Sequence, residues 1–299
     1  MPDCMGCGVV GLGMMGERHA RIWAELPRTE LVSVFDVVAD RSAETASRHG
    51  CKAAGSLGEM LNDPGIGLVS ICTDDQSHRE ACIAAAEAGK HILVEKPLAT
   101  TVADAQAILD ACRAAGVKLL TGHCVRFDPR YAVAKQAIEE GEVGDIVQVF
   151  GRRNNITASG RRIAPRTSVA FFLGVHDIDI MRWFADSPVV RVYAESCSKV
   201  LADLNREDTI FTLMKFANGA VGCLETCWVV PEGVSNTLDA RLEVVGTTGR
   251  VAVRVGELHA DEAAFILARV QDVDAKRLAL AAAQQQIADK LRELAAARA

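Results

Sequence analysis

The sequence predicts an α/β fold with a parallel sheet in its first part, followed by a part built on a mostly antiparallel sheet. Short apolar runs alternate with helical stretches over residues 1–124, whereas hairpin signals dominate after residue 124. The chain has 299 residues and is 49% hydrophobic, so it is long enough to bury two cores. We therefore expect a first domain at 1–124, a second at 125–260, and a helical tail at 261–299, where Ala, Leu, Gln, Lys and Arg are abundant.

The strands of the first part are predicted from five apolar runs, at 6–11, 30–36, 67–73, 91–95 and 118–124. The stretches between them have helical patterns, at 14–26, 40–49, 76–89 and 101–115. In the last of these, Val102, Ala105, Ile108 and Cys112 recur at helical spacing. Near-continuous apolar strands separated by helices are typical of parallel sheets, so we expect helices on both faces.

The turn after the first run reads Gly11-Leu12-Gly13-Met14-Met15-Gly16, the G-x-G-x-x-G pattern of Rossmann sheets that bind dinucleotides. Gly11 permits the tight turn, Gly13 lets the backbone approach a pyrophosphate, and Gly16 lets the helix pack closely on the strand. The helix that begins near Met14 and Met15 then offers free N–H groups and the positive end of its dipole to the phosphates. This turn is therefore assigned to cofactor binding.

Asp36 ends the second apolar run, about 20 residues beyond Gly16, where a carboxylate receives the hydroxyls of the adenosine ribose. A carboxylate there would repel the 2′-phosphate of NADP, so NAD is the favoured cofactor. Arg41 lies close by in the sequence and could accommodate that phosphate, which keeps NADP open.

Further polar side chains follow the run 67–73, at the carboxyl edge of the sheet where the ligand crevice of such folds forms. We assign Thr73, Asp74 and His78 to the cofactor site on that basis. The alternative for Asp74, and for its neighbour Asp75, is to cap the next helix.

Glu95 and Lys96 stand at the end of the run 91–95, at the same edge, and Pro97 follows them. Both are assigned to the cofactor site. The ammonium of Lys96 would face the nicotinamide, where it could hold a substrate hydroxyl and exchange a proton with it. Pro97 restricts the backbone after the lysine and so helps to aim its side chain. The alternative is a lysine that only extends to solvent from a strand end.

Four segments together resemble the glucose–fructose oxidoreductase and inositol dehydrogenase (Gfo/Idh/MocA) family: GLGMMG (11–16), AGKHILVEKPLATT (88–101), TGHCVRFDPRY (121–131) and GVHDIDIMRW (174–183). The resemblance runs from about residue 6 to residue 255. It implies a Rossmann domain followed by a domain built on an open, mostly antiparallel sheet. It also implies NAD(P)-dependent oxidation or reduction of a sugar or cyclic polyol, homodimers or homotetramers, and a catalytic Lys96.

The second part begins with a predicted helix at 127–140 and a strand at 145–152. Asn218-Gly219 separates two strand-like runs, which is typical of a tight hairpin, and Thr247-Thr248-Gly249 separates two more. Consecutive hairpins predict an antiparallel sheet. One face would cover the helices, and the other, if apolar, would pair with another subunit.

His176 is the candidate general base, because an imidazole suits a hydroxyl that loses hydride; a capping or core histidine is the alternative. Asp177 is assigned to substrate binding, and Asp179 to a structural bond across the domain interface. Inositol dehydrogenases of the family usually have an aspartate four residues before this histidine, where the present chain has Phe172. Either Lys96 and His176 act without it, Asp177 replaces it, or the substrate differs.

A predicted loop at 151–167 contains no acidic residue but five arginines: Arg152, Arg153, Arg161, Arg162 and Arg166. This suggests recognition of an anionic substrate, such as a sugar acid, sugar phosphate or nucleotide sugar, with Arg153 in the site. The alternative is a solvated or subunit-contact loop. His123 and Arg126, near the junction of the two parts, are assigned to the same substrate site.

Together these features favour an NAD(P)-dependent oxidoreductase that transfers hydride between nicotinamide and a ring secondary alcohol of a sugar, sugar derivative or cyclic polyol. The alternatives are an NAD-dependent glycoside hydrolase and a cofactor-binding sensor with altered catalysis. A net charge of −6 argues against nucleic acid as a partner. With no apolar run of about 18 residues and no signal-peptide pattern, we expect a cytoplasmic protein without membrane spans. The ten cysteines are interpreted as reduced thiols rather than a metal site.

Overall fold

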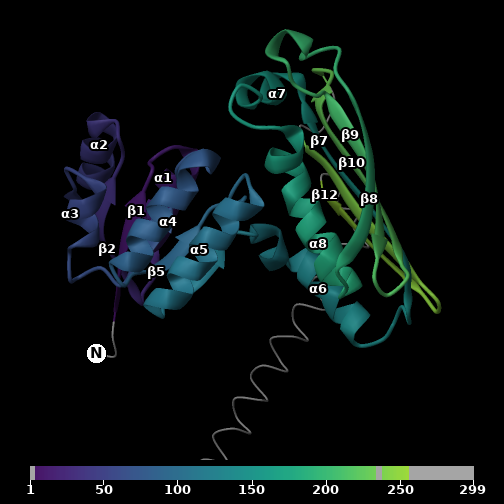
Figure 1. The fold of residues 1–299 in the computed structure, drawn as a ribbon, viewed down its shortest axis with the longest axis horizontal. Coiled ribbons are helices and arrows are strands. Elements are labelled where there is room, and N and C mark those ends of the chain that lie inside the picture. The colour runs from purple at the N-terminus through teal and green to yellow at the C-terminus, as the bar shows by residue number, and fades with distance from the viewer. Residues whose placement is uncertain (1–3, 234–237, 256–299) are drawn as a thin grey trace, which may run out of the picture. The chain divides into compact units, whose positions relative to one another are not determined.

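The computed structural model describes residues 4–233 and 238–255, which form two compact units (Figure 1). The first unit lies within Met1–His123 and also includes Ile163–Val175; the second lies within Cys124–Arg162 and His176–Ala299. None of the described helices is long and apolar enough to cross a membrane. The predicted helical tail at 261–299 lies outside the described residues.

The first unit is built on a six-stranded parallel sheet in the order β3-β2-β1-β4-β5-β6, the doubly wound order of dinucleotide-binding folds. Its strands are β1 (Met5–Val10), β2 (Thr29–Phe35), β3 (Lys52–Ala53), β4 (Leu68–Ile71), β5 (His91–Val94) and β6 (Leu119–Thr121). The five predicted strands are confirmed. The pattern missed β3, because two exposed residues at a sheet edge carry no apolar run.

Helices cover both faces of this sheet (Figure 1). They are α1 (Met14–Glu25), α2 (Ala39–His49), α3 (Leu57–Leu61), α4 (His78–Glu87) and α5 (Val102–Ala115). Val9 and Val34 of the strands pack on one side with Ala20 of α1 and Ala46 of α2. On the other side, alternate strand residues pack with α4 and α5 through Ala85 and Ile108, among others. The sequence pattern missed α3, a short helix that Ser56 caps by accepting the N–H of Glu59.

The second unit is built on a six-stranded open sheet in the order β12-β11-β7-β10-β9-β8. Its strands are β7 (Ile146–Ile156), β8 (Val189–Cys197), β9 (Thr209–Phe216), β10 (Val221–Val230), β11 (Leu238–Gly246) and β12 (Arg250–Val255). Only the β7–β10 pair is parallel. Both predicted hairpins are confirmed: one joins β9 to β10 at Asn218-Gly219, where Gly219 has a φ of 94°, and the other joins β11 to β12.

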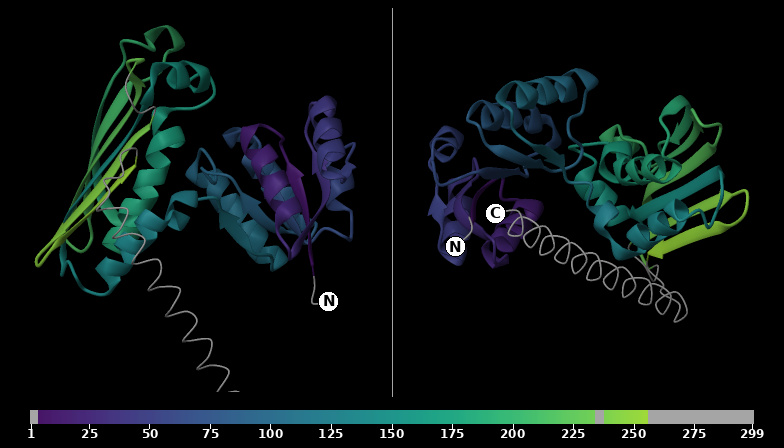
Figure 2. Two further views of the ribbon diagram at one scale, coloured as in Figure 1. Left: turned by 180° about the vertical axis from the view of Figure 1, so that it is seen from behind. Right: turned by 90° about the horizontal axis from the view of Figure 1, so that it is seen from below.

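Two helices, α6 (Pro129–Glu139) and α8 (Val175–Ala185), cover one face of the second sheet (Figure 1 and Figure 2). Tyr131 of α6 and Ile180 and Phe184 of α8 pack there on Leu224 and Leu242 of the strands. The predicted helix at 127–140 corresponds to α6, whose N-cap Asp128 accepts the N–H of Arg130.

The prediction of a loop at 151–167 is wrong. Strand β7 continues to Ile156, and α7 (Thr157–Ile163) follows it directly. The arginine pair hid the strand, because alternate residues of β7 face opposite sides of the sheet and each arginine has its own carboxylate partner there. Arg152 bonds Glu225 and Arg153 bonds Asp177.

Candidate functional site

The glycine turn between β1 and α1 is shaped for a close backbone approach. Gly11 has a φ of 82°, and a Cβ there would lie 2.8 Å from the backbone of Cys72. A Cβ on Gly16 would lie 1.8 Å from the carbonyl oxygen of Gly11, so this glycine brings α1 onto the turn. A Cβ on Gly13 would meet nothing within 4 Å, which means that Gly13 borders open space. Open space beside the N-terminus of α1 fits a pyrophosphate, so the turn is suited to NAD.

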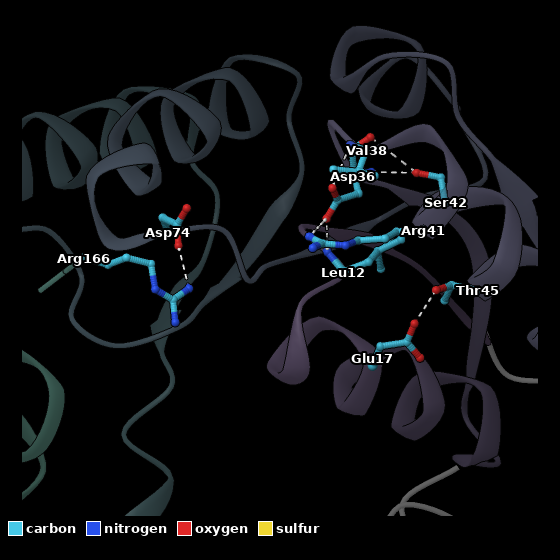
Figure 3. Close-up of polar contacts among 9 residues, drawn as sticks. All are labelled: Leu12, Glu17, Asp36, Val38, Arg41, Ser42, Thr45, Asp74 and Arg166. Carbon is cyan, nitrogen blue, oxygen red and sulfur yellow. Dashed lines mark hydrogen bonds and ion pairs between the residues drawn. The ribbon is translucent and has the colours of Figure 1, made fainter. Parts of the chain in front are cut away.

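Asp36 lies directly after β2 and is fixed to this turn (Figure 3). Its Oδ2 accepts the N–H of Leu12 at 2.6 Å, and its Oδ1 accepts the N–H of Val38 at 2.8 Å. Because a carboxylate has about four acceptor positions, these two bonds leave capacity for ribose hydroxyls. The guanidinium of Arg41 is 3.8 Å from Oδ2, and its side chain is largely exposed. The arrangement fits the ribose of NAD.

The segment 163–175 belongs to the first unit and contacts the turn that follows β4. Arg166 Nη1 lies 3.4 Å from Asp74 Oδ1 (Figure 3), and the hydroxyl of Thr167 donates to Asp75 Oδ2 at 3.0 Å. Asp74 is the N-cap residue of the 3₁₀ turn Asp75–Ser77, but its side chain makes no capping bond there. The sequence did not predict that residues so late in the chain join this edge.

His78 has a different role from the predicted one. Its ring is fully buried, with Nδ1 2.8 Å from the carbonyl oxygen of Pro97 and Nε2 3.2 Å from that of Thr73. A fully buried ring has no surface for a ligand, so the prediction that His78 contacts the cofactor is wrong. It instead connects the turn after β4 with the turn after β5. Thr73 and Asp74 remain predicted cofactor contacts.

Lys96 follows β5 at the carboxyl edge of the sheet and is half-buried. Its ammonium donates to the carbonyl oxygen of Phe172 at 3.2 Å and lies 4.8 Å from the centre of the Phe172 ring. Phe172 belongs to a π-helical turn, Ala170–Gly174, and such turns are frequent at functional sites. At the position where the family comparison led us to expect an aspartate, an aromatic ring therefore lies next to the lysine.

Glu95 has partners that sequence reasoning missed. His19 of α1 lies 3.2 Å from Oε1 of Glu95, and the backbone N–H of Lys96 donates to Oε2, also at 3.2 Å. Burial is the largest effect and raises the pKa of Glu95, but His19 and the Lys96 N–H together hold that pKa below its ordinary value. A signal for His19 did exist, since it is a polar residue on the sheet-facing side of a helix.

In the second unit, His176 lies in the first turn of α8 and is half-buried. Arg126 forms a two-pronged ion pair with Asp179, with both N···O distances 2.7 Å, and its guanidinium stacks over Trp183 at 5.3 Å. The hydrogen bond to Asp179 raises the pKa of Arg126. Arg126 and Asp179 both belong to the second unit. His123 follows β6 in the first unit and, like Arg126, remains a predicted substrate contact.

Asp177 and Arg153 form a buried ion pair rather than a substrate site. Arg153 Nε lies 2.5 Å from Asp177 Oδ2, and Nη2 lies 3.2 Å from Oδ1 and 3.4 Å from the Tyr131 hydroxyl. The Asp177 side chain is 0% exposed and that of Arg153 is 7% exposed, so the predicted substrate contacts of both residues are wrong. Burial raises the pKa of Asp177, with Arg153 opposing the rise. Burial would lower the pKa of Arg153, but Asp177 outweighs it and raises that pKa.

The arginines at 151–167 do not form one anion receptor. Four of them have carboxylate partners, in the pairs Arg152–Glu225, Arg153–Asp177, Arg161–Asp203 and Arg166–Asp74. Their charges are balanced within the fold, so this segment does not support the expectation of an anionic substrate.

Comparisons with known proteins agree with this geometry. Residues 5–123 match the model described as "Oxidoreductase family, NAD-binding Rossmann fold", and residues 131–252 match the GFO/IDH/MocA C-terminal domain. The chain is 30% identical over 259 residues to myo-inositol 2-dehydrogenase of Thermotoga maritima, covering 83% of this chain and 74% of that protein. It is 32% identical over 253 residues to scyllo-inositol 2-dehydrogenase (NAD(+)) of Bacillus subtilis, covering 83% of this chain and 73% of that protein.

Among solved structures, GenD2 from gentamicin A biosynthesis, in complex with NAD, matches with a TM-score of 0.77 and 28% identity. That match covers 85% of this chain and 73% of GenD2. The glycine turn, Asp36 and both matched domains lead to one conclusion: this chain belongs to the Gfo/Idh/MocA family of NAD-binding oxidoreductases.

Proposed function

We propose that this NAD-dependent oxidoreductase oxidises a ring secondary alcohol of a cyclic polyol of the inositol type, or reduces the corresponding ketone. The observation that carries the proposal is the ammonium of Lys96 at the carboxyl edge of β5, held by the carbonyl of Phe172. The names of the relatives, which are myo- and scyllo-inositol 2-dehydrogenases, support the substrate class.

The proposed roles follow from the chemistry of the side chains. The glycine turn and the N-terminus of α1 hold the pyrophosphate, and Asp36 receives the ribose hydroxyls. When bound, NAD supplies the hydride acceptor. Lys96 donates a hydrogen bond to the substrate hydroxyl oxygen, and His176 takes the hydroxyl proton as hydride leaves the carbon. We also propose residues 1–124 as the cofactor domain and 125–260 as the substrate domain.

The substrate proposal predicts a pattern of turnover. The purified chain, incubated with inositol isomers, neutral sugars, uronic acids and nucleotide sugars, is expected to reduce NAD with inositols and to use NADP at least about tenfold less well, because Asp36 repels a 2′-phosphate. Absorbance of the reduced cofactor measures this. Turnover of a uronic acid in preference to every neutral polyol would contradict the substrate class. Release of a sugar without net NADH would indicate a glycoside hydrolase instead.

We propose that the protein forms a homodimer or homotetramer through the sheet face opposite α6 and α8. Four large side chains are exposed on that face of β8, β9 and β10: Tyr193 (60%), Phe211 (50%), Leu213 (54%) and Val221 (48%). Tyr193 pairs with Leu213 across the strands, whereas Met214 beside it is buried against the helices, so the four share the outer face. A contiguous apolar area of this kind is typical of subunit contacts.

Leu213→Asp is expected to shift the protein toward monomer, because an interface would have to bury the new carboxylate. Light scattering coupled to size-exclusion chromatography measures the mass. Val192→Asp is the matched control, since Val192 is equally exposed, at 59%, but pairs with Met214 and therefore lies on the opposite face of β8. A monomeric parent protein, or equal dissociation by both variants, would contradict the proposed interface.

A further inference from the structure

A chain of hydrogen bonds connects α1 with the end of β5, next to Lys96. Trp23 Nε1 donates to the hydroxyl oxygen of Ser70 at 2.8 Å. That oxygen lies 3.2 Å from His19 Nδ1, and His19 Nε2 lies 3.2 Å from Glu95 Oε1. Ser70 is fully buried, and the side chains of His19 and Glu95 are only 13% and 12% exposed. These bonds are therefore largely shielded from water.

The strand periodicity explains why these residues meet. Ile71 of β4 and Val94 of β5 point into the core under α4 and α5. Their neighbours Ser70 and Glu95 therefore point to the opposite face, toward α1. His19 and Trp23 are four residues apart in α1, so they lie on one face of that helix and reach the same strand region.

The donor and acceptor capacities of Trp23, Ser70 and His19 determine where the protons in these hydrogen bonds lie. The indole N–H of Trp23 can only donate, so the Ser70 oxygen accepts from it. The Ser70 hydroxyl can then donate to His19 Nδ1, which leaves the hydrogen on Nε2, facing Glu95. Each donor and acceptor in this series of hydrogen bonds therefore has a partner when His19 is neutral and its Nε2–H donates to the carboxylate of Glu95. Oε2 of the same carboxylate accepts the backbone N–H of Lys96.

Without His19, burial would dominate the titration of Glu95. Other titratable groups facing this carboxylate include the Cys72 thiol after β4 and the adjacent Lys96, and Gly122 after β6 brings no side chain. Burial raises the pKa of Glu95, whereas the hydrogen bond from His19 is the main effect that lowers it. Removal of His19 is therefore expected to move this pKa upward and to leave the carboxyl protonated at a higher pH.

We propose that His19 is a positioning residue that keeps Glu95 ionised and fixed beside Lys96, so that a negative charge favours the oxidised cofactor over the reduced one. In doubly wound sheets of this order, the half that contains β4, β5 and β6 holds the second mononucleotide of the cofactor. The nicotinamide ring carries a positive charge in NAD⁺ and none in NADH. The proposal concerns cofactor binding, and it rests on the proposed function only in taking NAD as the ligand.

The test compares the dissociation constants of NAD⁺ and NADH by calorimetry from about pH 4.5 to about pH 8. In the parent protein the ratio is expected to stay nearly constant, because Glu95 remains ionised. In His19→Ala the ratio should shift toward NADH by about three- to tenfold as the pH falls, with the midpoint above the ordinary range of a glutamate. His19→Gln should restore the parental ratio, since its amide can donate to Glu95 and accept from Ser70.

Glu95→Gln is the second arm of the test, and it does not require His19→Ala to fold. It should show the NADH-shifted ratio at every pH, because its amide carries no charge. A parental, pH-independent ratio in folded His19→Ala or in Glu95→Gln would overturn the proposal. Failure of the parent protein to bind either nucleotide would instead overturn its assignment as an NAD enzyme. His49→Ala serves as a control, since His49 lies in the last turn of α2 and should leave the ratio unchanged.

Discussion

Replacement of Lys96 by alanine is expected to lower kcat by about 100-fold or more, because it removes the ammonium that donates a hydrogen bond to the reacting oxygen. The dissociation constant of NAD should change far less than kcat, since the glycine turn and Asp36 remain intact. Steady-state kinetics with the best polyol substrate and calorimetry with NAD measure the two effects separately.

The control for this variant is Lys52→Ala, which removes an exposed lysine paired with Glu59 at the distant edge strand β3. It should retain the parental rate. Small primary amines added to Lys96→Ala should recover part of the lost activity if the amine itself is required. A Lys96→Ala enzyme with a rate within a few-fold of the parent would show that the lysine is not catalytic, whatever the substrate.

Asp177→Ala is expected to lower the free energy of unfolding by about 3–5 kcal/mol, because it leaves the guanidinium of Arg153 buried without a counter-charge. Urea unfolding followed by circular dichroism measures this loss, provided that the slope of the transition is unchanged. The double variant Arg153→Met/Asp177→Leu should recover most of it, since apolar side chains of similar size can replace a buried ion pair.

The matched control is Asp203→Ala, which breaks the surface pair with Arg161, whose side chain is 48% exposed. Water and salt screen that pair, so its loss should lower the free energy of unfolding far less than the loss of Asp177 does. Equal effects of Asp177→Ala and Asp203→Ala would mean that the buried pair contributes no more than the exposed one.

Much of the first unit could be predicted because its signals are local. A strand inside a parallel sheet is apolar along its whole length, and a helix with one buried face repeats its apolar residues at helical spacing. The glycine turn and Asp36 also depend on backbone constraints within a short segment. The structure confirms these elements to within a few residues. The hairpins of the second sheet were predictable for the same reason.

Contacts between distant segments were not predictable in this way. In the sequence, Arg153 looks like a ligand-binding side chain. Only the structure shows that its guanidinium forms an ion pair with Asp177 of α8. His78 looks like a crevice residue, and only the packing around α4 shows that it is fully buried. In both cases the partner comes from another element of the fold.

The sequence by itself determined the alternation of strands and helices, the nucleotide-binding turn and the position of Lys96 after a buried strand. Each of these depends on periodicity or backbone geometry within a few consecutive residues. Only the tertiary structure decided the surroundings of that lysine, where Phe172 is 76 residues away along the chain and His19 reaches the neighbouring Glu95 across the same distance of 76 residues. Hydrogen bonds and ion pairs act over a few ångströms in space, and no pattern of consecutive residues encodes which distant partner will come within that range.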